Sequence, residues 1–249
     1  MVSLHILFRS CAVVKTLSKT SKRPFGLDKP TMILKSLKSL LSSCSKSKDK
    51  IFLEIVDDSS PEEFRDKMRD MLKNSKVSCK FHPMNFRNNG KSLKYCYDLA
   101  SKSKSDIIYF CEDDYIHFES EIKFVLDAYK EKIVGSNQFC VHPTDYPDRY
   151  KRLYPSYVFL SSSIHWRSIA HTTGTLYVPK KVFDRFSKNF FTFADMNSGS
   201  IGGGEDKTLN KIFDEVPCIS PIPSLAAHLN DDTLPSLVDW KKLIDSISI

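Results

Sequence analysis

The sequence predicts an α/β fold in which a mostly parallel central sheet is flanked by helices and joined to a smaller, mixed C-terminal half. Apolar stretches of strand length alternate with segments of helical periodicity over residues 1–135, which is typical of βαβ units. The pattern becomes irregular after Ser136. We expect the second half, 136–249, to be built onto the same sheet without a separating linker, so that residues 1–249 form a single domain.

Four strands and four helices are expected in the first half. The strands are short apolar runs, and the run that ends at Cys111 is continuous, which indicates a central strand covered on both faces. The predicted strands are 4–8, 51–56, 77–81 and 106–111. The predicted helices follow apolar residues at helical spacing and lie near 30–44, 60–72, 93–100 and 119–130.

The second of these helices has the clearest start signal. In Ser60-Pro61-Glu62-Glu63, the serine stands where a side chain caps a helix, and the proline stands at the first helical position. The second glutamate stands at the third position, which completes a capping box. We therefore expect Ser60 to be the N-cap of this helix.

Signals in the second half are weaker. Short strands are expected near 139, 158 and 176, and helices from Pro179 and from about Asp206. The proline-rich stretch 144–155 is predicted to be an exposed loop.

The net charge of +7 is concentrated near the N-terminus. Residues 1–50 hold eleven lysines and arginines against two aspartates, a net of +9, so the other 199 residues sum to −2. A basic region of this kind is typical of proteins that bind nucleic acid, an acidic membrane or the phosphates of a nucleotide. The lysines alternate with serine and leucine, which favours solvated surface lysines over a dedicated patch.

The cysteines and the apolar runs indicate a soluble, cytoplasmic protein. Seven cysteines are scattered without a Cys-x-x-Cys pair, and four lie in apolar runs, as reduced and buried thiols do. No apolar stretch approaches the roughly 18 residues of a membrane span. The first nine residues lack the basic start of a signal peptide.

Acidic side chains follow two of the predicted strands. Asp-Asp-Ser-Ser occupies 57–60, and Glu-Asp-Asp occupies 112–114. Ligands of open α/β sheets bind beyond the carboxyl ends of the strands, so both clusters are expected at one binding edge. Because buried carboxylates need compensation, a divalent cation with hydrogen-bond donors is the expected partner. The first cluster is also typical of a turn, whereas three acids after a buried strand favour a functional site.

A third acidic feature lies in the second half. Three glycines at 202–204 precede Glu205 and Asp206, and an apolar-periodic segment follows. The pattern fits a flexible loop whose acids stabilise a helix N-terminus. It also fits a mobile hinge that brings a carboxylate to a substrate, or glycines that bind phosphate through their N–H groups.

Taken in order, these elements resemble a glycosyltransferase of family 2 with the GT-A fold. The order is a strand, the acids at 57–60, a helix, Asn-Asn-Gly-Lys-Ser at 88–92, a helix, a strand, the acids at 112–114, and later Glu205-Asp206. The resemblance covers residues 2 to about 215. It implies a Rossmann-like GT-A sheet, with a nucleotide-sugar-binding half at 1–135 and an acceptor-binding, catalytic half at 136–249.

The resemblance assigns roles to single residues. It implies a nucleoside-diphosphate sugar, preferably UDP-linked, as donor, a glycan or other hydroxyl as acceptor, and Mn²⁺ or Mg²⁺ as metal. Asp206 would be the base of an inverting displacement, with Glu205 as its rival. Asp114 would be the main metal ligand, with Glu112 and His228 as further candidates. The predicted substrate-binding residues are Arg9, Asp57, Asp58, Asn89, Lys91, Glu112, Asp113 and Trp166, the last by stacking on a sugar ring.

The sequence departs from the family pattern in several places. Glu112 stands at the first acidic position of the DxD element, and Phe8-Arg9-Ser10 ends the first strand where a Pro-Thr-Tyr-like turn is usual. The insert 11–29 is also atypical. The Gln-x-x-Arg-Trp element of processive synthases does not follow the acids, which implies transfer of one sugar at a time.

Two alternatives stay open. A nucleotidyltransferase on a related fold carries a glycine-rich loop after its first strand, and here no glycine precedes Gly26. A non-catalytic module would use the basic first third to bind nucleic acid with strong salt dependence. Because that module leaves both acidic clusters unexplained, nucleic acid is not the expected partner.

Overall fold

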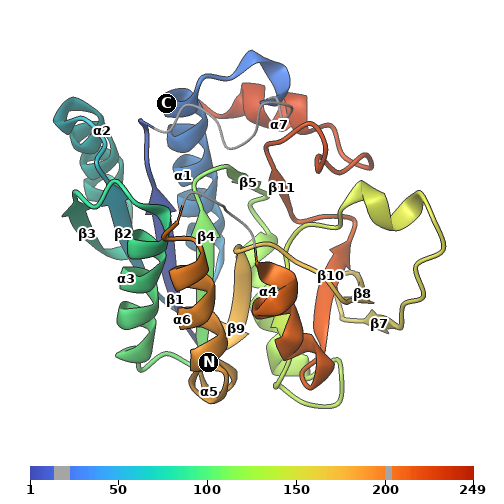
Figure 1. The fold of residues 1–249 in the computed structure, drawn as a ribbon. Coiled ribbons are helices and arrows are strands. Elements are labelled where there is room, and N and C mark those ends of the chain that lie inside the picture. Colours follow the sequence, from blue (N-terminus) through green and yellow to red (C-terminus); the bar gives the residue numbers. More distant parts are fainter. Residues whose placement is uncertain (14–22, 200–203) are drawn as a thin grey trace.

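The computed structural model describes residues 1–13, 23–199 and 204–249, and Figure 1 shows its arrangement. Within these ranges, nine strands form one sheet in the order β3-β2-β1-β4-β9-β6-β10-β8-β7, and β5 pairs with β11 in a second, small sheet. The strands are β1 Ser3–Ser10, β2 Lys50–Asp58, β3 Ser78–Met84, β4 Ile107–Glu112, β5 Tyr115–His117, β6 Cys140–Val141, β7 Val158–Leu160, β8 His165–Ile169, β9 Leu176–Pro179, β10 Cys218–Ile222 and β11 Ala226–His228. The helices are α1 Lys29–Lys46, α2 Glu62–Lys73, α3 Asn89–Ser101, α4 Glu121–Glu131, α5 Lys180–Arg185, α6 Ser187–Met196 and α7 Trp240–Ser246, with 3₁₀ turns at Pro24–Gly26, Pro147–Tyr150, Glu205–Lys207 and Leu209–Asp214.

The first part of the large sheet is parallel. β1 pairs in parallel with β2 and β4, and β2 pairs in parallel with β3. β9 lies antiparallel beside β4, where the mixed second half of the sheet begins. The carboxyl ends of β1, β2 and β4 therefore meet at one edge, the upper edge in Figure 1. This arrangement confirms the predicted fold class.

Helices cover both faces of the large sheet. Leu4, Ile6 and Phe8 of β1 pack in one core with α1, α2 and α4. Leu7 points the other way and packs in a second core with α3, α5 and α6. All four side chains are buried, and their alternation is the period-two pattern of a strand covered on both faces.

Helix α3 starts at the binding edge of the sheet, and its start requires glycine. Asn88 caps the helix by accepting the N–H of Lys91 at 2.9 Å. A Cβ on Gly90 would lie 2.1 Å from the carbonyl oxygen of Ala194, because the end of α6 packs directly against this turn. The Asn-Asn-Gly-Lys-Ser motif therefore holds α3 and α6 together beside the site.

The predicted capping box at the start of α2 is wrong. The helix begins at Glu62, and Pro61 stands at the N-cap without a side-chain hydrogen bond. The hydroxyl of Ser60 instead donates to the carboxylate of Asp57 at 2.6 Å and accepts the N–H of Ala12 at 2.9 Å. A buried carboxylate one turn away is a stronger partner for the hydroxyl than the exposed N–H groups of the helix start.

Two predictions for the second half need correction. The helix expected from about Asp206 is a pair of short 3₁₀ turns. The expected exposed loop at 144–155 divides into two parts: Asp145 and Arg149 in the first part are buried and paired at 3.1 Å, whereas most of 150–155 is exposed as predicted. Within this stretch, Leu153 is exposed as predicted. The strands expected near 139, 158 and 176 and the helix after Pro179 are confirmed as β6, β7, β9 and α5.

Membrane and thiol features agree with the sequence. Across the described ranges, no helix has the length and apolar character to cross a membrane. Five cysteines are buried free thiols, namely Cys44, Cys96, Cys111, Cys140 and Cys218.

Candidate active site

A cavity of about 510 Å³ opens at the carboxyl ends of β1, β2 and β4. Residues at the ends of these three strands and at the starts of α1 and α3 line it. Those that the following argument uses are Arg9, Lys29, Asp58, Asn88, Asn89, Glu112, Asp113 and Asp114. The cavity therefore brings the two acidic clusters of the sequence to one place, as their positions after parallel strands predict.

Each of the three consecutive acids after β4 pairs with a basic side chain from a different segment. The N–O pairs are Glu112 with Arg9 at 2.7 Å, Asp113 with Lys29 at 2.5 Å and Asp114 with His228 at 3.3 Å. All of these side chains are at most partly exposed. Buried carboxylates are tolerated only when they are compensated in this way.

Glu112 is held by the end of β1. Arg9 donates one N–H to Glu112 and another to the side-chain oxygen of Asn89 at 2.6 Å, so it joins the acid to the start of α3. The hydroxyl of Thr175 lies against the same glutamate and accepts its backbone N–H at 3.2 Å. Burial raises the pKa of Glu112 above its ordinary value, and the Arg9 charge opposes this rise. The Arg9 charge therefore limits the rise that burial causes.

Asp114, which lines the cavity, forms a charged pair with His228. Burial, the largest single effect, opposes ionisation of Asp114, but the charge and hydrogen bond of His228 together with the charges of Lys29 and Arg9 hold the pKa of that carboxyl below its ordinary range. In return, burial opposes the imidazolium, and Asp114 overcomes it and raises the pKa of His228. The ring of His228 stacks on Tyr115 with centroids 4.9 Å apart, and its Nδ1 contacts the hydroxyl of Thr233 at 3.0 Å. These contacts fix Nε2 toward Asp114.

The same pair suits a divalent metal. Oδ1 of Asp114 is buried and accepts no hydrogen bond from the described part of the chain. A carboxylate oxygen is a good ligand for Mn²⁺, and the imidazole nitrogen of His228 could join it once a bound metal had displaced its proton. No group of three His, Cys, Asp or Glu side chains encloses a metal position in residues 1–13, 23–199 and 204–249. A metal at Asp114 would therefore complete its shell with water and with phosphate oxygens of a substrate.

Lys29 is a site residue that the sequence did not reveal. It is the first residue of α1, and its ammonium binds Asp113, whose other oxygen accepts the N–H of Cys11 at 2.9 Å. A cation in the first turn of a helix is unfavourable with the helix dipole. In the sequence, Asp28 is a good N-cap, but Lys29 directly after it is unfavourable in a first helical turn. This local conflict could have marked Lys29 as a functional residue.

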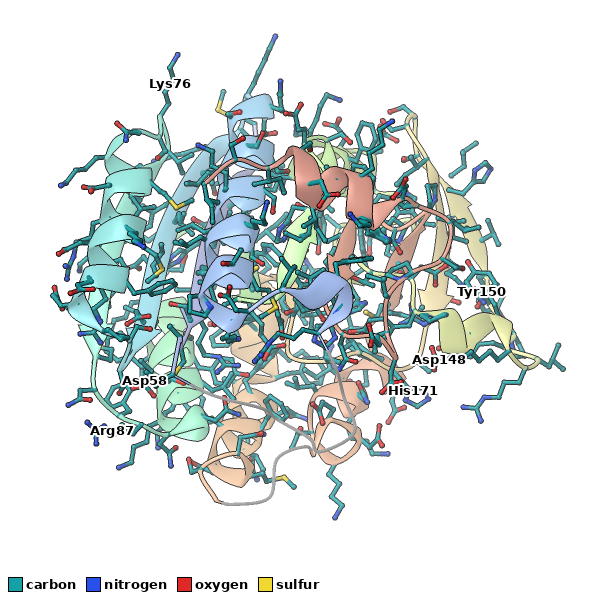
Figure 2. The ribbon with its side chains drawn as sticks, turned by 90° about the horizontal axis from the view of Figure 1, so that it is seen from above. Asp58, Lys76, Arg87, Asp148, Tyr150 and His171 are labelled. Atoms are coloured by element: carbon teal, nitrogen blue, oxygen red, sulfur yellow. The ribbon has the colours of Figure 1, made fainter. Side chains whose placement is uncertain are left out.

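Asp57 and Asp58 are consecutive residues of β2, so their side chains point to opposite faces. Asp57 is wholly buried, pairs with Nε of Arg65 at 2.7 Å and does not line the cavity, so its predicted nucleotide contact is corrected to a structural role. Asp58 lines the cavity and accepts the backbone N–H groups of Phe86, Arg87 and Asn88. Figure 2 shows Asp58 and Arg87 on the same side of the molecule. Asp58 therefore shapes the turn into α3 at the cavity rim.

Two other predicted substrate contacts do not reach the cavity. Trp166 lies in β8 with no exposed surface, and its Nε1 donates to the hydroxyl of Ser161 at 3.1 Å. Its predicted stacking on a sugar is wrong, because the ring has no open face. Lys91 is exposed on α3 and is not part of the cavity lining.

Glu205 and Asp206 start a 3₁₀ turn after Gly204, whose φ of +105° requires glycine. The glycines at 202 and 203 lie outside the described residues. Asp206 is exposed, and its Oδ1 accepts the side-chain N–H of Asn210 at 2.7 Å. Nδ1 of His171 lies 3.6 Å from the same oxygen. In the view of Figure 2, the labelled His171 lies well to one side of Asp58.

Comparison with known proteins agrees with this arrangement. A Rossmann-like sheet with an acidic cluster after its central parallel strand is the GT-A type of fold. The family model described as Glycosyl transferase family 2 matches residues 28–198, and the chain belongs to this family. No curated protein matches the chain.

Solved structures of TarS from S. aureus share the fold. One has a TM-score of 0.53 at 12% identity and covers 88% of this chain and 35% of that one. TarS 1–349 has a TM-score of 0.50 at 11% identity and covers 88% of this chain and 57% of that one. The chain therefore spans about a third of the longer TarS chain, and the likeness concerns the fold.

Proposed function

We propose that this chain is a metal-dependent glycosyltransferase that moves one sugar, with inversion, from a nucleoside-diphosphate sugar to an acceptor hydroxyl. UDP is the favoured nucleotide, as the resemblance implies. The observation that carries the proposal is the acidic cluster at 112–114, which lines a 510 Å³ cavity at the binding edge of a family 2 sheet. A cavity of this size accommodates a nucleotide sugar.

Asp114 and His228 are the proposed metal ligands, with Glu112 beside them. A divalent cation bound there would stabilise negative charge on the departing diphosphate. Arg9 and Lys29 line the same cavity, and their charges face the position where that negative charge develops. Asn89 orients Arg9 through their 2.6 Å hydrogen bond.

Asp206 is the proposed base. An inverting displacement needs a carboxylate on the side of the sugar opposite to the leaving group, and this group must reach the acceptor. Asp206 is open to solvent, whereas the acids of the cluster are already paired. Glu205, which is partly buried, is the rival carboxylate.

Donor binding tests the first part of the proposal. UDP and Mn²⁺ added together should raise the melting temperature of the parent protein, because a ligand that binds only the folded state stabilises it. Asp114→Asn should stay folded and lose metal-dependent UDP binding in calorimetry, with Lys91→Gln as the control. GDP and CMP serve as competing nucleotides. Equal binding by the parent and Asp114→Asn would contradict the metal assignment, and no shift with any nucleotide would contradict the donor site.

Turnover tests the base. Asp206→Asn should lower turnover by roughly 10²–10⁴-fold, the usual contribution of a positioned general base. Donor and metal affinity should remain near parental, since the base acts on the acceptor in the transition state. Glu205→Gln is the matched comparison. A larger loss in Glu205→Gln would transfer the role to Glu205.

A further inference from the structure

The side chain of Asn210 joins two segments that meet at Asp206. Its Oδ1 accepts the backbone N–H of Thr172 at 3.1 Å, and its Nδ2 donates to Oδ1 of Asp206 at 2.7 Å. Asn210 lies in the 3₁₀ turn Leu209–Asp214 and is buried. A buried amide with both ends engaged has one fixed orientation.

The two ends of the amide satisfy two different partners. The N–H of Thr172 can only donate, so the atom facing it must be an oxygen. The carboxylate of Asp206 accepts when ionised, so the atom facing it must carry hydrogen. A carboxylate at 210 would keep the first contact and turn the second into a repulsion between like charges.

Thr172 is linked along the chain to a residue that contacts Glu112, and Glu112 lines the cavity. Three residues further on, Thr175 lies against Glu112, and three residues of extended chain span at most about 11 Å. On the other side, Arg149 is buried and donates to the carbonyl oxygen of His171 at 3.2 Å, which holds this stretch from behind. Asn210 therefore ties Asp206 to the chain segment that contacts Glu112.

We propose that Asn210 is the positioning residue that orients the carboxylate of Asp206 toward the acceptor hydroxyl, a role that rests on the proposed function. With Oδ1 engaged by Asn210, the second oxygen of Asp206 is the one left to take the proton. The charged groups placed around this carboxylate are His171 at 3.6 Å and the neighbouring Glu205 and Lys207, while Lys211 is engaged by Asp214.

The test compares three variants in the full chain. Asn210→Asp introduces the repulsion, and Asn210→Ala removes the contact. Asn189→Ala is the control, because Asn189 donates to the carbonyl of Thr208 at 3.0 Å and so holds the same segment from α6. The assay follows UDP release from UDP-glucose, UDP-galactose and UDP-N-acetylglucosamine with mixed methyl glycosides as acceptors.

Asn210→Asp should lower kcat by roughly 10–100-fold and leave the donor KM within about twofold, since misplacing a reacting group costs rate rather than binding. The acid limb of the kcat profile should move to higher pH, because a second carboxylate disfavours the ionised base. Asn210→Ala should lower kcat with a smaller movement of the limb. Asn189→Ala should keep the parental kcat and profile.

A substrate-free measurement accompanies the kinetics. Carbon NMR of the Asp206 carboxyl in the parent and in Asn210→Asp should show a titration midpoint higher by about half a pH unit or more in the variant. An unchanged midpoint, or parental kcat in both Asn210 variants, overturns the positioning role. If Asp206→Asn keeps parental turnover while UDP and Mn²⁺ still bind, the base assignment and the inference both fail, and the donor site stands.

Discussion

The two acidic regions of this site differ in burial and in how their charges are compensated. At the end of β4 the acids are buried, and each meets a cation from a distant segment. At Asp206 the carboxylate is exposed, stands on a short 3₁₀ turn and is held by one amide and one imidazole. A buried carboxylate needs a protein cation or hydrogen-bond donors for the fold to be stable, whereas water stabilises the charge of an exposed carboxylate. Substitutions in the first region should therefore lower both activity and stability, whereas substitutions in the second should lower activity with little change in stability.

Asp57, in β2, is a buried and paired acid like those at the end of β4, and its loss should have the largest effect on stability. Asp57→Ala removes the partner of Arg65, which is 13% exposed in its side chain. Breaking a buried ion pair from one side typically costs about 3–5 kcal/mol, because the remaining charge loses its buried partner; among the described residues, Arg65 keeps only the exposed carboxylate of Glu62, at 3.6 Å, as a counter-ion. Urea unfolding of the parent and the variant measures this difference. Asp57→Ala/Arg65→Met should recover part of the loss, and a cost below about 1 kcal/mol for the single variant would contradict the comparison.

Glu121 shows what happens to an acid buried without a cation. It is fully buried in α4 and accepts the hydroxyl of Tyr177 at 2.6 Å. Burial raises the pKa of Glu121 to about 8. The folded state therefore holds a proton that the unfolded chain, with an ordinary pKa near 4.5, releases. This contribution to stability is complete below about pH 4.5 and is lost as the pH rises through about 8.

Glu121→Gln should remove this pH dependence. One pKa unit corresponds to about 1.4 kcal/mol, so the parent should lose on the order of 2–4 kcal/mol between pH 5 and pH 8 through this residue. The glutamine variant should show a flatter curve, with the difference read from urea unfolding at each pH. Glu63→Gln, at an exposed position of α2, is the control. Parallel curves for the parent and Glu121→Gln would show that Glu121 is ionised in the fold.

The sequence predicts the parallel sheet and the acidic edge with Asp114, because strand ends meet in one place whatever the details of packing. His228 is named only by the family resemblance. The prediction fails at Asp57, since successive strand residues point to opposite faces and, of Asp57 and Asp58, only Asp58 reaches the cavity. The predicted sugar stacking of Trp166 fails for a related reason, because the sequence shows an aromatic residue but not that its ring is buried.

Lys29 and Asn210 were missed because each acts through a contact across the fold. The Lys29–Asp113 pair spans 84 residues, and the Asn210–Thr172 bond spans 38. No local periodicity records such pairs, since they depend on where α1 and the linker before β9 settle against the sheet. Short-range motifs define the binding edge, and long-range contacts define how its charges are compensated.

The smallest effect is expected at Asp206 and completes the comparison with Asp57. Asp206→Ala makes the same substitution as Asp57→Ala, but the side chain of Asp206 is 83% exposed. Asn210 loses one acceptor, and water at this exposed position can replace it, so the free energy of unfolding should change by no more than about 1 kcal/mol. Turnover should nevertheless fall by the factor expected for a general base. Urea unfolding and UDP release on the same preparation measure both quantities. A stability loss comparable to that of Asp57→Ala would show that Asp206 is part of the structural framework, and the drop in turnover would then be a consequence of misfolding rather than of lost proton transfer.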